Sequence, residues 1–238
     1  MKNIFSVSQY RHVVLPGHFA PGFERTDLYN KAFHFWKTFW NDVFRANGSS
    51  DVVNENDFIR SEIVSLILSE YDEIVGLHLY SVLNLEKMNT PFHPYLVSAE
   101  GESFLSELTD RGCRSALPLE YLTVNAAFRK SVIGFSFAPI VTGLGYRIQS
   151  ELGIDASLGR CRSDLKVNNL MTDVGGVVLK RDVMMHNTPV DFCAVFLGEM
   201  TSHPDLAVQA AIDDLWQRRE DVAGLTKTER ASRIQSVS

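Results

Sequence analysis

The sequence predicts a mixed α/β fold in which a largely antiparallel central sheet is flanked by helices. Short runs rich in β-branched and aromatic residues alternate along the chain with segments of helical periodicity. Polar segments at residues 70–73 and 186–189 each join two such runs, which is typical of hairpins. The 238 residues are 45% hydrophobic and 22% charged, as expected for a globular protein with a core of its own.

Seven strands are expected where β-rich runs are bounded by turn residues. They lie at residues 5–15, 63–68, 74–85, 117–124, 156–162, 177–185 and 190–197. Helices are expected where apolar residues recur at helical spacing or where a capping residue and a glycine bound a segment. They lie at residues 27–44, with Asp27 as the cap, and at 56–60, 102–108, 139–152, 164–174 and 204–219. Residues 90–94 are expected to form a loop.

The helix at residues 27–44 has an aromatic face that includes Trp36, Phe39 and Trp40. Packing against the sheet is the favoured interpretation, and the lining of an acyl pocket is the alternative. We expect one domain over residues 1–200, followed by a C-terminal helix and flexible tail at 201–238.

Composition and charge exclude several classes of function. The net charge of -6 gives no overall basic field for nucleic acid. No apolar run reaches the roughly 20 residues of a membrane span, and the N-terminus lacks the features of a signal peptide. Cys113, Cys161 and Cys193 are odd in number and far apart, which favours free thiols in the cytoplasm. No Cys/His spacing is typical of a zinc site, so no metal is expected.

A strand–loop–helix segment at residues 119–153 carries the candidate chemistry. Val124 ends the strand, residues 125–128 form a turn, and a loop then runs from Arg129 to Gly134. Unpaired N–H groups at a helix N-terminus carry partial positive charge and bind phosphate. A phosphate-binding loop is therefore predicted, with a solvated surface turn as the alternative; its residues are Arg129, Lys130, Ser131, Val132, Ile133 and Gly134.

This segment resembles the central motif of the GNAT acyltransferases, in which a strand ending in valine precedes Arg or Gln–x–x–Gly–x–Gly or Ala and a helix. The resemblance covers residues 63–197 and implies a CoA pyrophosphate over the loop. Val132 stands at the first glycine position. That departure indicates a shifted loop, a weaker grip on coenzyme A, or an acyl carrier protein as donor, as used by autoinducer and N-acyl amino acid synthases, which this chain resembles. No prosthetic group is implied; acyl-CoA or acyl carrier protein is the co-substrate.

The resemblance also assigns roles on the strand itself. Glu120 occupies the position of a general base, which would remove the proton of the attacking amine; an ion-paired strand residue is the alternative. A bulge in this strand would turn a backbone N–H of Leu122, Thr123 or Val124 toward the thioester carbonyl and stabilise the oxyanion.

Downstream, Asn168 and Asn169 would bind the pantetheine arm, or else serve as helix caps. Many members carry a tyrosine four residues before the glycine that ends the following helix, and it protonates the leaving thiolate. The matching positions hold Met171 and Thr172, so that role is unfilled or supplied from elsewhere.

We therefore expect an N-acyltransferase that moves an acyl group from a thioester to an amine or amino acid by direct attack in a ternary complex. The acceptor would enter between the N-terminal helix and the loop at residues 91–95. No nucleic acid and no integral membrane contact are expected. The alternative is a catalytically degenerate GNAT fold that binds an acyl ligand or a partner protein.

Overall fold

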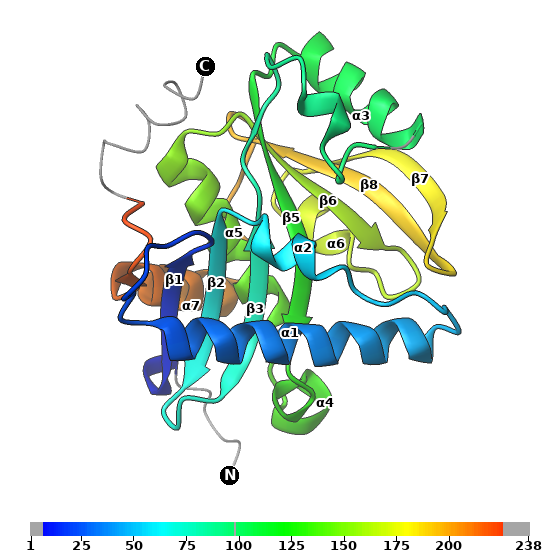
Figure 1. The fold of residues 1–238 in the computed structure, drawn as a ribbon. Helices are drawn as coiled ribbons and strands as arrows, with labels where there is room; N and C mark the ends of the chain where they lie inside the picture. Colours follow the sequence, from blue (N-terminus) through cyan, green and yellow to red (C-terminus); the bar gives the residue numbers. More distant parts are fainter. Residues whose placement is uncertain (1–6, 98, 226–238) are drawn as a thin grey trace. The chain divides into compact units, whose positions relative to one another are not determined.

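The computed structural model describes residues 7–97 and 99–225 (Figure 1). The chain forms two compact units. The first comprises Met1–Leu79, Tyr121–Gly145 and His203–Gly224, and the second comprises Tyr80–Glu120, Tyr146–Ser202 and Leu225–Ser238. The polypeptide passes from one unit to the other within strand β5 (Ser115–Val124) and helix α5 (Ala138–Leu152).

The strands of the first unit follow the order β3-β2-β1-β9. Strand β1 pairs antiparallel with β2, from Tyr10↔Ser69 to Pro16↔Ile63, and β9 adds a short parallel pairing to β1. The turn predicted between β2 and β3 is confirmed, with Asp72 at φ 60°. These strands are β1 (Tyr10–Pro16), β2 (Ile63–Ser69), β3 (Ile74–Tyr80) and β9 (Glu220–Asp221).

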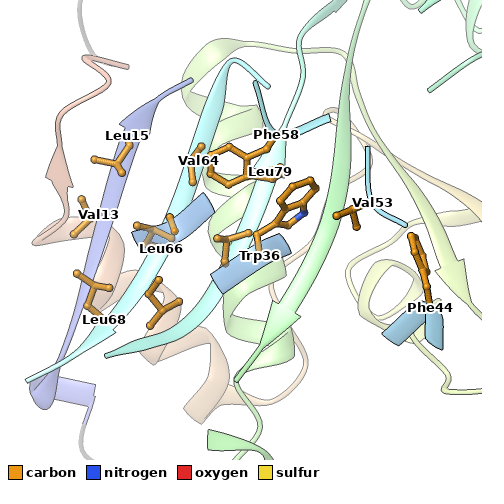
Figure 2. Close-up of a cluster of buried hydrophobic side chains, with 13 residues drawn as sticks. Val13, Leu15, Trp36, Phe44, Val53, Phe58, Val64, Leu66, Leu68 and Leu79 are labelled. Atoms are coloured by element: carbon orange, nitrogen blue, oxygen red, sulfur yellow. The ribbon is translucent and has the colours of Figure 1, made fainter. Parts of the chain in front are cut away.

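Helices cover both faces of these strands. Because side chains alternate between the faces of a strand, Leu66 and Leu68 contact the α1 side, while Ile67 packs with α5 and α7. Trp36 of α1 is fully buried in a cluster of apolar side chains that includes Val13 of β1 and Leu66 of β2 (Figure 2). The interpretation of this helix as packed against the sheet is therefore confirmed. The helices are α1 (Thr26–Ala46), α2 (Glu55–Ile59), α4 (Lys130–Ile133) and α7 (Leu206–Gln217), with 3-10 turns η1 (Val7–Gln9) and η3 (Ala126–Phe128).

The strands of the second unit follow the order β7-β8-β6-β5, with β4 paired to β5. Strands β5 and β6 are parallel, whereas β6–β8 and β7–β8 are antiparallel. The predicted β7–β8 hairpin is confirmed: His186 and Asn187 form its turn, at φ 47° and 60°. The elements are β4 (Leu83–Asn84), β6 (Ala156–Arg162), β7 (Val177–Met185), β8 (Thr188–Phe196), η2 (Thr90–Phe92), α3 (Ala99–Asp110) and α6 (Asn169–Thr172).

Several predicted boundaries are wrong. Strand β1 begins at Tyr10, because η1 precedes it; residues 5–6 of the predicted strand lie outside the described residues. The strand predicted at 74–85 ends at Tyr80, and β4 is a separate strand. Only the last part of the helix predicted at 164–174 is helical, as α6. Arg25, not Asp27, stands at the cap of α1, and Asp27 lies in its first turn.

The predicted fold class is confirmed: the chain is a mixed α/β protein whose strands are mostly antiparallel and are flanked by helices. The predicted C-terminal helix is α7, capped by the Asp205 side chain, and β9 follows it. Residues 226–238 of the predicted tail lie outside the described residues. None of the described helices has the length and apolar character that a membrane span requires.

Candidate functional site

Strand β5 changes character at Glu120. Its parallel pairing with β6 runs from Ala116↔Ala156 to Leu119↔Gly159 and then stops, although β6 continues to Arg162. Glu120 is thus the first residue beyond the paired segment. The backbone of the following residue, Tyr121, adopts φ 60°, a left-handed conformation that is strained for a residue with a bulky side chain. The expected bulge region, residues 122–124, begins directly after this distortion.

Glu120 is buried in the second unit, with 7% of its surface exposed. The hydroxyl of fully buried Ser81 donates a hydrogen bond to Glu120 Oε1 at 2.8 Å. This bond fixes the position of one carboxylate oxygen and thereby sets the orientation of the Glu120 carboxylate. Ser81, which follows β3, was not singled out by sequence reasoning, because no local pattern links it to a strand 39 residues away.

Tyr95 and Arg160 lie in the same unit and interact electrostatically with each other. The Arg160 guanidinium carbon lies 4.3 Å from the centroid of the Tyr95 ring, and Nη2 donates to the Tyr95 carbonyl. Burial raises the pKa of the Tyr95 phenol well above its usual value; Arg160 opposes the shift and Glu120 adds to it. The phenol therefore remains protonated. A charged residue within a predicted strand was the available sequence signal for Arg160.

The distorted end of β5 is held by hydrogen bonds within the first unit. Trp40 Nε1 donates to Thr123 Oγ1 at 2.9 Å, and that hydroxyl donates to the Tyr121 carbonyl at 2.7 Å. Thr123 is fully buried. The Tyr121 hydroxyl bonds to Asp57, and its ring meets the Trp40 ring edge-on. Leu122 and Val124 are partly buried in the α5–α7 cluster.

The segment predicted as a phosphate-binding loop contains helix α4. The amides of Val132 and Ile133 donate to the Arg129 carbonyl, and the Gly134 amide donates to the Lys130 carbonyl. Gly134 ends this turn at φ 76°. These three amides are therefore engaged, and all residues from Arg129 to Gly134, Ser131 included, are exposed. The predicted loop conformation is wrong for residues 130–133, which form a single helical turn. The binding of a phosphate by this segment stays a prediction.

Three comparisons place this geometry among known proteins. No protein-family model matches the sequence, and no curated protein matches it. Solved structures do match. The N-acyl amino acid synthase FeeM from uncultured soil microbes aligns over 84% of this chain and 98% of its own, with a TM-score of 0.52 and 11% identity.

Two further structures are similar. The CoA-dependent acyl-homoserine lactone synthase BjaI covers 94% of this chain and 99% of its own, with a TM-score of 0.56 and 12% identity. Arylalkylamine N-acetyltransferase 2 from Aedes aegypti covers 80% and 100%, with a TM-score of 0.55 and 11% identity. The chain shares the fold of these three proteins.

Met171 and Thr172 stand at the positions near α6 where the GNAT resemblance would place a tyrosine. The structure brings a tyrosine there from another element: the Tyr146 hydroxyl of α5 donates to the Leu170 carbonyl at 3.1 Å. Leu170 immediately precedes Met171, which is buried and stands at one of the two expected positions. Burial raises the pKa of the Tyr146 phenol, so it remains a hydrogen-bond donor.

The two asparagines of the predicted GNAT pantetheine site differ in their surroundings. Asn168 stands at the N-cap position of α6, where its side chain makes no cap hydrogen bond. Its Nδ2 donates instead to the buried Asp191 carboxylate at 2.9 Å. Asn169 is exposed. His78 is fully buried, and burial lowers its pKa to about 3. Among residues 7–97 and 99–225, no group of three or more His, Cys, Asp or Glu side chains is arranged to hold a metal ion.

Proposed function

We propose that this protein is an N-acyltransferase that moves an acyl group from an acyl thioester to the amine of a small acceptor. The observation that carries the proposal is the position of Glu120: buried, oriented by Ser81, and located where β5 leaves β6 in a GNAT fold. A buried, oriented carboxylate suits proton removal from an attacking amine. FeeM, BjaI and the Aedes enzyme are named as acyl-transferring enzymes that act on amines or amino acids or form acyl-homoserine lactones, which supports this class.

In the proposed reaction, the amine nitrogen attacks the thioester carbonyl directly. Glu120 accepts the amine proton, and a backbone N–H of Leu122, Thr123 or Val124 donates to the developing oxyanion. Collapse of the tetrahedral intermediate breaks the carbon–sulfur bond and releases the thiol. An acyl-enzyme is not expected, because all three cysteines are buried, and the pKa of the Cys161 thiol is raised by its hydrogen bond to Cys193 and by burial.

The donor would contact the exposed segment around α4. The amides of Val132, Ile133 and Gly134 are engaged in the turn. The exposed side chains of Arg129, Lys130 and Ser131 would contact a phosphate. Exposed Asn169 is available to the pantetheine arm. Acyl-CoA and acyl carrier protein both present a phosphate and a pantetheine thioester, so both are candidate donors.

The test measures thiol release and product formation with acyl-CoA and acyl carrier protein, each mixed with a panel of amines and amino acids. A base that acts in the rate-limiting proton transfer contributes roughly 10²- to 10⁴-fold, so Glu120→Gln should lower kcat/KM by that factor. The control is Glu86→Gln, which removes an exposed carboxylate from the same unit and should leave the rate unchanged. An unchanged rate in Glu120→Gln would show that the base is elsewhere.

A catalytically degenerate protein that binds an acyl ligand is the second candidate. The closed α4 turn and the absence of tyrosine at Met171 and Thr172 favour it. Calorimetric binding of acyl-CoA or acyl carrier protein, without thiol release under any acceptor, is the outcome that distinguishes it from the enzyme.

A further inference from the structure

No acidic side chain in the described part of the chain forms an ion pair with Arg160. Its guanidinium is 4.3 Å from the Tyr95 ring centroid and 5.4 Å from that of Phe192, and its one hydrogen bond goes to the Tyr95 carbonyl. Neighbouring Arg162 on the same strand differs, because Asp164 pairs with it. The aromatic rings therefore orient the Arg160 guanidinium without accepting hydrogen bonds from all of its N–H groups.

Two buried polar atoms beside this charge have no hydrogen-bond partner among the described residues. They are Arg160 Nε and the Tyr95 hydroxyl, and Tyr95 is only 4% exposed. A buried donor left unsatisfied destabilises a fold, and most buried donors are therefore paired. Nε together with a terminal nitrogen forms the side of the guanidinium that binds a carboxylate through two parallel hydrogen bonds. An oxyanion would satisfy both donors, and no described residue supplies one.

The location of this cluster links it to the proposed base. Gly159 is the last β6 residue paired to β5, and its partner is Leu119. Arg160 and Glu120 are therefore the next residues on two parallel strands, which lie about 5 Å apart where they pair. Tyr95 interacts electrostatically with both charges. A small molecule that carries an amine and a carboxylate a few bonds apart has the spacing to reach Glu120 and Arg160 together.

We propose that Arg160 and Tyr95 form an anion subsite that binds the carboxylate of the acceptor. This inference rests on the proposed function and narrows its acceptor to amino acids and other carboxylate-bearing amines. The guanidinium binds the carboxylate through Nε and a terminal nitrogen, and the Tyr95 hydroxyl donates a further hydrogen bond. The amine is thereby presented to Glu120. An amine without a carboxylate leaves the Arg160 fork unsatisfied and is selected against.

The test compares each amino acid of a panel with the amine formed by its decarboxylation. Loss of a charge-assisted hydrogen-bond pair costs roughly 10- to 100-fold in binding. Wild-type protein should therefore favour the amino acid by that factor. Arg160→Met should raise KM for amino acids by roughly 10- to 100-fold with little change in kcat, and should leave kcat/KM for the decarboxylated amines unchanged. Arg162→Met, on the same strand, should change neither.

Further variants separate binding from folding. Tyr95→Phe removes only the hydroxyl and should weaken amino acid acceptors while leaving thermal unfolding nearly unchanged. Arg160→Lys keeps the charge but not the fork, and should recover part of the affinity if Arg160→Met fails to fold. Equal use of both members of each pair by wild-type protein, or an equal loss for both in the Arg160 variants, would overturn the subsite.

Titration calorimetry of acceptors in the absence of an acyl donor tests the subsite by binding alone, without any need for turnover. Amino acids should bind wild-type protein, their decarboxylated amines should not, and Arg160→Met should abolish the binding. If transfer occurs but the carboxylate makes no difference, the subsite is refuted while the proposed function stands. If no acceptor supports transfer, the proposed function fails, and the amino acid titration still tests the subsite. Binding of inorganic phosphate or coenzyme A that depends on Arg160, without amino acid binding, would assign the subsite to the donor instead.

Discussion

Thr123 connects a helix of the first unit to the distorted backbone of β5, and Thr123→Val removes that connection with almost no change in volume. The Thr123 hydroxyl accepts from Trp40 Nε1 at 2.9 Å and donates to the Tyr121 carbonyl at 2.7 Å. Thr123 is fully buried, so water has no access to replace either bond at this position. Tyr121, at φ 60°, is the residue whose conformation these bonds stabilise.

The substitution leaves two groups without their partner, the indole N–H and a backbone carbonyl. A polar group that loses its partner in a protein interior costs about 1–3 kcal/mol. Trp40 is only partly buried, so we expect a combined loss near the lower end, about 2–3 kcal/mol in the free energy of unfolding. This is a large share of the roughly 5–15 kcal/mol that stabilises a typical domain.

Urea unfolding followed by tryptophan fluorescence measures the loss, provided that the m-value is unchanged. Thr142→Val is the matched control: Thr142 is also buried in the first unit, but its hydroxyl donates only to the Ala138 carbonyl of its own helix. We expect that variant to lose less than about 1 kcal/mol. Equal losses in the two valine variants would refute the bridging role of Thr123.

Activity provides a second readout of the same change. A shift of the backbone after Tyr121 would misplace the proposed oxyanion donor, so Thr123→Val should lower kcat more than it raises KM. Thr123→Ser keeps the hydroxyl and should restore kcat.

Two further predictions concern buried side chains. His12 and His78 are fully buried, and burial lowers the pKa of each to about 3, with Arg219 contributing at His12 and the Val141 backbone opposing at His78. An unfolded histidine titrates near pH 6.5, so below that pH the unfolded chain binds protons that the buried imidazoles do not. The free energy of unfolding is therefore highest above about pH 6.5 and falls as the pH drops toward 3, by up to about 1.4 kcal/mol per pH unit for each residue. Urea unfolding between pH 7 and 5 should show this slope, and His12→Gln should reduce it by about half; a flat profile would contradict the burial of neutral imidazoles. Tyr146→Phe removes the bond to the Leu170 carbonyl and should cost about 1 kcal/mol in unfolding free energy, with kcat/KM changed less than about tenfold. A fall of more than about 100-fold at unchanged stability would instead make Tyr146 the proton donor to the leaving thiolate.

Local signals predicted the elements that depend on local physics. The periodic aromatic residues of α1 predict a helix with one apolar face, and Trp36 lies on that face in the core. The His186–Asn187 turn was predictable because its residues tolerate positive φ and it joins two β-rich runs. Glu120 was identified by resemblance, and its burial agrees with a position on an inner strand.

The rest depends on contacts that the sequence does not display. The turn of α4 forms from backbone hydrogen bonds among Arg129, Lys130 and the residues that follow, where no periodicity exists to be read. The Ser81–Glu120 bond joins residues 39 positions apart. Arg160 meets Tyr95 across 65 positions. Such partners are brought together by the pairing of strands, so a charged residue within a predicted strand is the local sign that the sequence offers.

The central claim, acyl transfer from a thioester to an amine with Glu120 as the base, is tested most directly by measuring released thiol and N-acylated product in one reaction. We predict equal amounts of the two, both dependent on the acceptor, no acylated protein by intact mass spectrometry, and a kcat/KM that falls roughly 10²- to 10⁴-fold in Glu120→Gln. Absence of thiol release with every donor and acceptor, or an undiminished rate in Glu120→Gln, would contradict the account.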